Sequence, residues 1–154
     1  MKHYINKQTN EIYAYAADGS QDAYIKAGLV PISDAELAAL RAPTAEQMKE
    51  AAIAAIESAY VAEKEAPITY AGHVFQADAG SVELMTQVAS ALPAGVGIGW
   101  YDVNNIEVPL TDVQFAELRG SILMRGQPLF KKRRTLKDAI AAATTVAGVE
   151  AISW

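Results

Sequence analysis

The 154-residue sequence contains no cysteine. Disulfide bonds, thiolate catalysis and cysteine-ligated zinc sites are therefore excluded. Basic residues are in a minority as well: 13 lysines and arginines stand against 18 aspartates and glutamates, which gives a formal net charge of −5. General nucleic-acid binders need a basic face to displace counterions from phosphates. We therefore expect no nucleic acid among the partners.

Long apolar runs are also missing. No stretch approaches the roughly 20 apolar residues that a membrane-spanning helix requires, and the first 15 residues lack the apolar segment of a secretion signal. We therefore expect no membrane association and a protein made in the cytoplasm. Hydrophobic residues still make up 51% of the chain, which is enough for a core. Because many of them are alanines, we expect that core to be modest.

The local patterns predict an α+β fold, in which small antiparallel β-hairpins alternate with helices. Each expected hairpin combines two short β-prone segments with a turn. The hairpins are expected at residues 4–15, 68–77 and 98–110, with turns at 8–10, 71–72 and 104–105. Residues 29–32 should be extended, because the residue before Pro31 is pushed out of the helical region.

Capping boxes at Ser33, Thr44 and Thr111 mark three helix starts. The helix after Thr44 should reach about Glu65, with a narrow, alanine-rich apolar stripe that either packs lightly on a neighbour or needs a partner chain. Shorter helices are expected at residues 21–26, 35–41 and 81–92. In the last part of the chain, Gly126 and Pro128 should interrupt the helix that begins at Thr111, and a further helix should follow.

These elements predict two small units joined by the long alanine-rich helix. The amino-terminal hairpin-helix unit is expected at residues 1–43, the connecting helix at 44–66, and a carboxy-terminal α+β unit at 67–154. Because its apolar stripe is narrow, self-association through the long helix is one partner hypothesis.

No pattern in the sequence supports a reaction. The glycines at residues 95, 97 and 99 precede a strand, whereas a dinucleotide-binding loop opens a helix, so we interpret them as the approach to a hairpin. His73, Asp78 and Ser81 lie close in sequence, but no metal-ligand spacing or nucleophile motif accompanies them. We therefore expect no enzyme, no catalytic residue, no cofactor and no metal.

Two surface patterns remain open. The basic run Lys131–Lys132–Arg133–Arg134, near Arg125 and Lys137, either contacts a phosphate or an acidic partner surface or forms a solvated helix face, and the last interpretation is favoured. Tyrosines crowd into the small amino-terminal unit, where they form either an interface or an internal hairpin core. We take the interface as the working hypothesis. The candidate partner-binding residues are Tyr4, Tyr13, Tyr15, Tyr24, Val30 and Ile32.

Two stretches resemble known phage proteins. The opening MKHYINKQTNEIYAY, followed by GLVPISDAELAAL, is similar to the amino-terminal part of phage tail-fibre assembly proteins. The second half resembles a domain of unknown function that is widespread in phage and prophage proteins. The matching stretches there are residues 75–78 with Ser81, 100–102, 108–111, 129–140, 142–146 and 149–154. Ala147 and Gly148 depart from the pattern, since this family more often has acidic residues there.

The resemblance implies a chaperone of the host cytoplasm that binds a newly made tail-fibre or tailspike chain. The partner region would be near the carboxy-terminal tip of that chain, and binding would promote its folding and trimerisation. The alternative is a structural virion component, an adaptor or cap that stays on the fibre. A hydrolase or lysis enzyme is a third class, for which the sequence offers no arrangement of residues.

Overall fold

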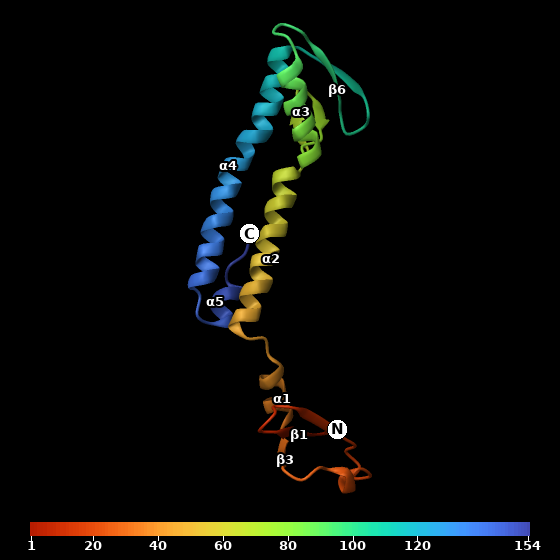
Figure 1. The fold of residues 1–154 in the computed structure, drawn as a ribbon, viewed down its shortest axis with the longest axis vertical. Coiled ribbons are helices and arrows are strands. Elements are labelled where there is room, and N and C mark those ends of the chain that lie inside the picture. The colour runs from red at the N-terminus through yellow and green to blue at the C-terminus, as the bar shows by residue number, and fades with distance from the viewer. The chain divides into compact units, whose positions relative to one another are not determined.

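The computed structural model describes residues 1–154, which form two compact units (Figure 1). The first unit comprises Met1–Thr44 and the second comprises Ala45–Trp154. The observed boundary lies one residue from the expected end of the amino-terminal unit. The helix expected to connect two units belongs to the second one, because it packs along a later helix of that unit.

The first unit is a three-stranded antiparallel sheet with one helix. The strands β1 (Lys2–Asn6), β2 (Ile12–Tyr15) and β3 (Leu29–Ile32) are arranged in the order β2-β1-β3. A short 3₁₀ helix, Asp22–Tyr24, lies between β2 and β3, where the sequence predicted a longer helix. The turn between β1 and β2 holds Asn10 at a φ of 58°, a conformation that asparagine tolerates.

Helix α1 (Asp34–Arg41) begins at the predicted capping box, in which Ser33 and Glu36 satisfy each other's backbone amides. Only two side chains of the first unit are buried, Ile5 on β1 and Leu37 on α1. The core of this unit is therefore thin.

The second unit is built around a helix pair. Helices α2 (Ala45–Glu65) and α4 (Asp112–Ala142) run in opposite directions side by side, and the short α5 (Val146–Glu150) packs against α2 (Figure 1). The predicted apolar stripe of α2 faces inward, with Ile56 only 2% exposed. Lys49 at the start of α2 donates a hydrogen bond to the carbonyl of Ala141 at 3.0 Å, near the end of α4.

Two hairpins and a helix lie between α2 and α4 in the chain. The hairpins are β4 (Ile68–Tyr70) with β5 (His73–Phe75), and β6 (Ile98–Tyr101) with β7 (Glu107–Leu110); helix α3 (Ala79–Ala91) connects them. Both hairpins were predicted, as were the turns at Ala71–Gly72 and Asn104–Asn105. The fold is α+β, as expected.

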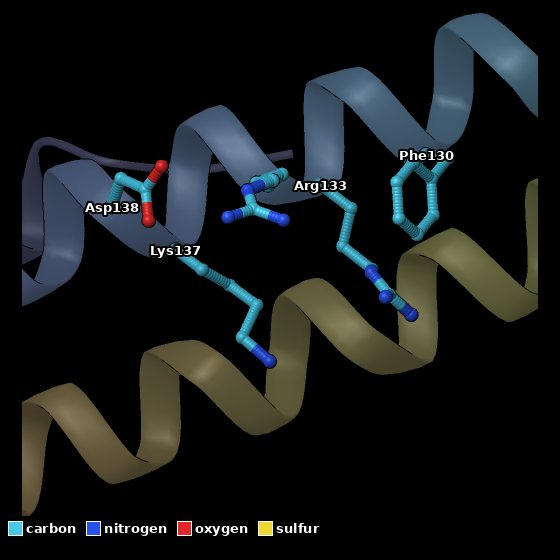
Figure 2. A pocket seen from close by; sticks show the side chains of 5 residues that line it. Phe130, Arg133, Lys137 and Asp138 are labelled. Atoms are coloured by element: carbon cyan, nitrogen blue, oxygen red, sulfur yellow. The ribbon is translucent and has the colours of Figure 1, made fainter.

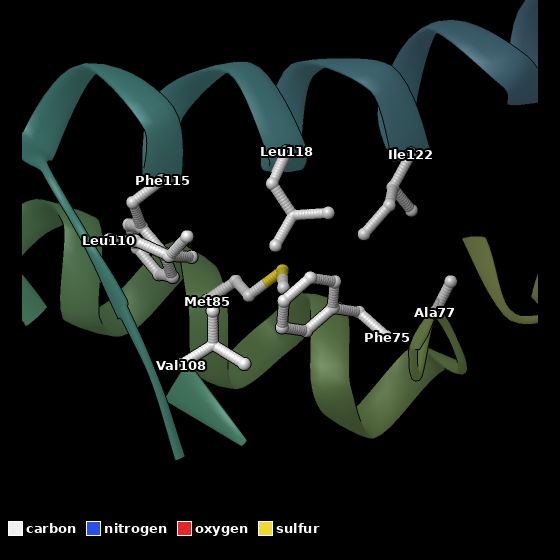
Figure 3. Close-up of a cluster of buried hydrophobic side chains, with 8 residues drawn as sticks. All are labelled: Phe75, Ala77, Met85, Val108, Leu110, Phe115, Leu118 and Ile122. Carbon is white, nitrogen blue, oxygen red and sulfur yellow. The ribbon is translucent and has the colours of Figure 1, made fainter. Parts of the chain in front are cut away.

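The main hydrophobic core lies where these hairpins and α3 pack on the first half of α4 (Figure 3). Met85 of α3 and Leu118 of α4 are fully buried at its centre, beside Phe75 of β5. Trp100 packs against this core, with its ring 5.1 Å from that of Phe115.

The predicted interruption at Gly126 and Pro128 is wrong, because α4 continues from Asp112 to Ala142 with Pro128 inside it. The buried residues Ile122 and Leu129 lie before and after the expected interruption, two turns apart on the same helix face. Their packing outweighs the tendency of proline to break a helix. Pro128 is exposed, so the carbonyl of the preceding turn that it leaves unpaired is near water.

Candidate partner-binding surface

The sheet register of the first unit brings three of the predicted tyrosines together. Tyr4 of β1 is directly opposite Tyr13 of β2, and Lys2 is opposite Tyr15. Residues opposite each other in an antiparallel pair share one face, so Tyr4, Tyr13 and Tyr15 lie on the same side of the sheet. We call this side the tyrosine face.

The tyrosines contact each other and their neighbours, yet each remains half-buried. The rings of Tyr4 and Tyr15 meet edge to face at 5.6 Å, a favourable arrangement for aromatic pairs. Tyr13 donates a hydrogen bond from its hydroxyl to Glu11 at 2.7 Å, and the Lys26 ammonium lies 5.1 Å from its ring centre. The face is thus an ordered aromatic surface that still presents part of each ring.

The hydrogen bond between Tyr13 and Glu11 also shifts the pKa of both side chains. It raises the pKa of the Tyr13 hydroxyl, because ionisation would place a second negative charge beside the carboxylate. The same bond, together with one from Thr9, lowers the pKa of Glu11. At neutral pH the tyrosine face therefore presents a neutral phenol whose hydroxyl is already held in place.

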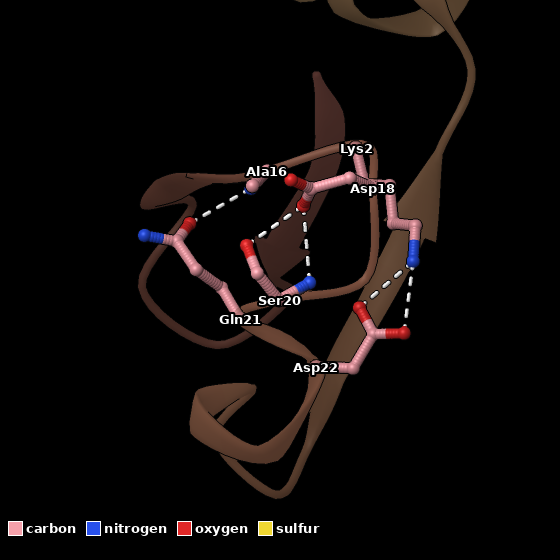
Figure 4. Close-up of polar contacts among 6 residues, drawn as sticks. All are labelled: Lys2, Ala16, Asp18, Ser20, Gln21 and Asp22. Atoms are coloured by element: carbon pink, nitrogen blue, oxygen red, sulfur yellow. Dashed lines mark hydrogen bonds and ion pairs between the residues drawn. The ribbon is translucent and has the colours of Figure 1, made fainter.

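The segment after β2 is tied to the sheet by polar contacts (Figure 4). Lys2 contacts both carboxylate oxygens of Asp22, at 2.8 and 2.9 Å, and Gln21 accepts a hydrogen bond from the backbone of Ala16. Asp18 accepts hydrogen bonds from the amide and the hydroxyl of Ser20. Beside these contacts, Tyr24 in the 3₁₀ helix leaves its side chain 75% exposed.

Val30 and Ile32 do not join the tyrosines. They are opposite Ile5 and His3, which puts them on the other face of the sheet. That face is the one covered by α1, since Ile5 is buried there and His3 lies 3.5 Å from Asp34 in the first turn of the helix. Five of the six predicted residues therefore divide between the two faces of the sheet, and Tyr24 lies outside the sheet.

Strand β2 carries a second feature of interest, its position at an edge of the sheet. The opposite edge strand, β3, contains Pro31, which has no N–H to donate and so discourages further strand pairing. Strand β2 contains no proline. The edge that offers backbone groups to an incoming strand is thus the one that carries Tyr13 and Tyr15.

The second unit does not assemble the residues that were considered for catalysis. Asp78 caps α3 and accepts hydrogen bonds from the amide and hydroxyl of Ser81. His73 lies elsewhere, 3.4 Å from Asp102. A hydrogen bond from the backbone N–H of Ile106 lowers the pKa of the buried Asp102. Smaller contributions in the same direction come from the backbone N–H of Asn104 and from the ring of His73. This carboxylate therefore stabilises the hairpin turn between β6 and β7.

The glycine-rich segment leads into a strand, as interpreted from the sequence. Gly95 donates its N–H to Asp112 at 2.8 Å, and β6 begins at Ile98. No group of three or more histidine, aspartate or glutamate side chains is placed where it could hold a metal ion. None of the helices combines the length and the apolar character needed to cross a bilayer.

The basic run is mostly solvated, as favoured from the sequence, since Lys131, Lys132 and Arg134 are exposed. Arg133 is half-buried, and several cations of this region contact neighbouring elements. Arg133 donates to Glu57 on α2 at 3.2 Å and stacks 4.6 Å from the ring centre of Tyr60. Lys132 lies 4.3 Å from the ring centre of Trp154, and that indole donates to Glu63 at 2.6 Å. Four cations of this region therefore hold α4 to α2 or to the chain end; they are Arg125, Lys132, Arg133 and Lys137.

A shallow groove beside these cations was missed by the sequence reasoning (Figure 2). Phe130 lines the hollow drawn in Figure 2, and Leu123 lines two adjoining hollows. These two exposed apolar side chains stand seven residues apart on α4, a spacing that would have revealed them. The expected break at Gly126 and Pro128 assigned the two residues to different helices and hid their common face.

Comparison with known proteins identifies a family without assigning a role. No curated protein and no solved structure matches the chain. The sequence profile of a family described as a domain of unknown function, DUF4376, matches residues 47–153. That range takes in almost the whole second unit and more than half of the chain, so the protein belongs to the DUF4376 family.

Proposed function

We propose that the protein is a phage tail-fibre assembly chaperone, which binds a newly made fibre or tailspike chain near its carboxy-terminal tip and promotes trimerisation. The proposal rests first on the resemblance of the opening residues to proteins of that kind. The structural observation that carries it is the edge strand β2, where Tyr13 and Tyr15 stand on one face beside a free sheet edge.

Such an edge suits the needs of a folding fibre. Trimers of this type depend on strand pairing between distant parts of different chains, which forms slowly and leaves strand edges exposed meanwhile. An edge strand can add to another strand through backbone hydrogen bonds, while the side chains on one face give selectivity. Tyrosine suits that face, because it offers a rigid apolar ring with a polar tip.

The role requires a binding surface and no catalytic group. Tyr4 supports the neighbouring ring of Tyr15, and Tyr24 adds an exposed ring in the same unit. Val30 and Ile32 lie on the opposite face, next to α1, and we assign them to support of the sheet. The proposed contact surface is therefore the tyrosine face with the free edge of β2.

Binding of the carboxy-terminal segment of the fibre chain, measured by biolayer interferometry, tests the proposal. The double variant Tyr13→Ala, Tyr15→Ala should lose at least tenfold in affinity, as expected when two interface aromatic residues are truncated. Tyr101→Ala is the matched control, since Tyr101 is an equally large, 57% exposed tyrosine of the second unit. Equal binding by the double variant and the control would refute the tyrosine face as the contact.

A further inference from the structure

The second unit has a shallow groove that follows one side of α4. Three adjoining hollows of about 290, 380 and 240 Å³ make it up. The first two share Lys64 and Leu123, and the second and third share Phe130. Two of these volumes are below the range of enclosed small-molecule pockets, roughly 300–1,000 Å³, and the third is near its lower end. Hollows of this size suit individual side chains of a polypeptide.

The floor of the groove is apolar and unusually exposed. Leu123 and Phe130 are 50% and 47% exposed, although both are large hydrophobic residues. Their spacing of seven places them two turns apart along one side of the helix. On the other side of α4, Lys132 and the ring of Trp154 cover the helix pair. On the Leu123 side, the start of α3 borders one end of the groove through Ala79 and Val82.

Four cations and two carboxylates line the groove, a positive balance in contrast to the whole chain; they are Lys64, Arg133, Arg134 and Lys137 against Glu83 and Asp138. Between Ile122 and Asp138, α4 carries no carboxylate and six cations: Arg125, Lys131, Lys132, Arg133, Arg134 and Lys137. Glu57 accepts from both Arg133 and Lys137 and offsets part of this charge. Arg134 also lines the groove, is exposed and takes part in none of the ion pairs of the structure. Lys64 supplies a cation from the α2 side.

We propose that this groove binds an amphipathic helix of another protein, with an apolar stripe for Leu123 and Phe130 and carboxylates for Arg134 and Lys64. The walls are mainly helices, whose backbone groups are paired except at Pro128, so an extended peptide would lack partners for most of its own amides in this groove. A helix brings its backbone hydrogen bonds with it. Residues 122–138 of α4 span about 25 Å, the length of a helix of about 17 residues.

A second copy of this chain fits the groove less well. In a two-fold symmetric dimer the same patch meets itself, which would set the cations of one α4 against those of the other. Nucleic acid fits less well too, since the floor is aliphatic at Leu123 and Glu57 already engages two of the cations. A helix with an apolar stripe and flanking carboxylates can contact both the apolar floor and the cations beside it. This surface lies in the second unit and is independent of the tyrosine face.

The probes for this proposal are two fluorescein-labelled peptides of about 18 residues. Both carry leucines at positions i, i+4, i+7 and i+11 on an alanine-rich helix; one has glutamates on its flanks and the other has lysines. Fluorescence anisotropy with the full chain should show binding of the glutamate peptide at least tenfold tighter than that of the lysine peptide. A single-stranded DNA of similar length and charge should compete poorly.

Adjacent residues of α4 provide matched controls. Leu123→Asp and Arg134→Glu should each weaken binding of the glutamate peptide at least fivefold. Met124→Asp and Lys131→Glu make the same chemical changes at exposed positions that do not line the groove, and they should leave binding within twofold. All four positions are exposed, so circular dichroism should report the same helix content for every variant.

Several outcomes would overturn the proposal. One is equal binding of the glutamate and lysine peptides, or no binding of either. Another is equal loss in Leu123→Asp and Met124→Asp. Tighter binding of the DNA than of the peptide would assign the groove to nucleic acid instead. Sedimentation velocity covers the remaining case: a dimer that Leu123→Asp dissociates would make the groove an interface between copies. None of these results depends on fibre binding by the first unit.

Discussion

Arg133 on α4 donates a hydrogen bond to the carboxylate of Glu57 on α2 at 3.2 Å, across 76 positions of sequence. Lys137, one turn further along α4, donates to the other oxygen of the same carboxylate at 2.7 Å. Glu57 therefore bridges two turns of the neighbouring helix. The hydrogen bond from Lys137, assisted by the charges of Arg133 and Lys137, lowers the pKa of Glu57.

The bridge predicts a pH-dependent contribution to stability. Because the pKa of Glu57 is lower in the folded protein than its unfolded value near 4.3, the carboxylate stabilises the fold above that value, and this contribution is lost as the pH falls through the folded pKa. Glu57→Gln should therefore lower the melting temperature at neutral pH, and its difference from the wild type should shrink as the pH is lowered to about 3. Glu50→Gln, at an exposed position of α2, is the control for thermal unfolding; a difference for Glu57→Gln that grows in acid would contradict the bridge.

Truncation of a side chain should destabilise the second unit strongly at the centre of its core and only slightly at the groove. Leu118 is fully buried, so Leu118→Ala should lower the free energy of unfolding by about 2–5 kcal/mol. Leu123→Ala, five residues along the same helix but half-exposed, should change it by less than about 0.5 kcal/mol. Tryptophan fluorescence during urea unfolding measures both, because Trp100 and Trp154 belong to this unit. Similar losses for the two variants would show that Leu123 is packed.

Continuity of α4 can be tested at its proline. A proline within a helix costs about 3 kcal/mol relative to alanine, so Pro128→Ala should raise the free energy of unfolding by about 1–3 kcal/mol. The gain arises because alanine supplies the missing N–H and removes the clash with the preceding turn. Gln127→Ala at the neighbouring exposed position should have little effect. A destabilised Pro128→Ala variant would indicate that the chain leaves the helix here and that proline favours the local conformation.

The turn between β4 and β5 holds an unfavourable residue. Ala71 has a φ of 49°, followed by Gly72 at 82°, a pair of left-handed conformations that favours asparagine at the first position. Ala71→Asn should therefore stabilise the protein by about 0.5–1 kcal/mol. The reverse change, Asn105→Ala at a φ of 59°, should cost a similar amount. Chemical denaturation checks both, and equal signs for the two changes would contradict the turn conformations.

Local signals in the sequence predicted most of the elements correctly. The capping boxes at Ser33 and Thr111 both form, because their hydrogen bonds span only three residues. The hairpin turns likewise depend on a few neighbouring residues. The aromatic excess of the first unit pointed to the tyrosine face, since alternating strand positions place Tyr13 and Tyr15 on one side whatever the partner strand is.

Features that depend on distant parts of the chain could not be predicted. The register of β3 on β1 places Val30 and Ile32 on the face of the sheet away from the tyrosines, and nothing local fixes that register. Packing of Ile122 and Leu129 carries α4 through Pro128, against its local preference. The contact of Trp154 with Glu63 joins residues 91 positions apart, so no local pattern in the sequence could reveal it.

The most direct test of the account is co-expression with the proposed partner, a phage tail-fibre or tailspike chain, scored as soluble trimer and as co-purification. Wild-type protein should yield fibre trimer that is absent when the fibre is expressed alone, and the Tyr13→Ala, Tyr15→Ala variant should lose that effect while Tyr101→Ala keeps it. Co-elution after trimerisation would show that the protein stays attached. Equal trimer yield without the protein, with nothing co-purifying, would contradict the assembly role.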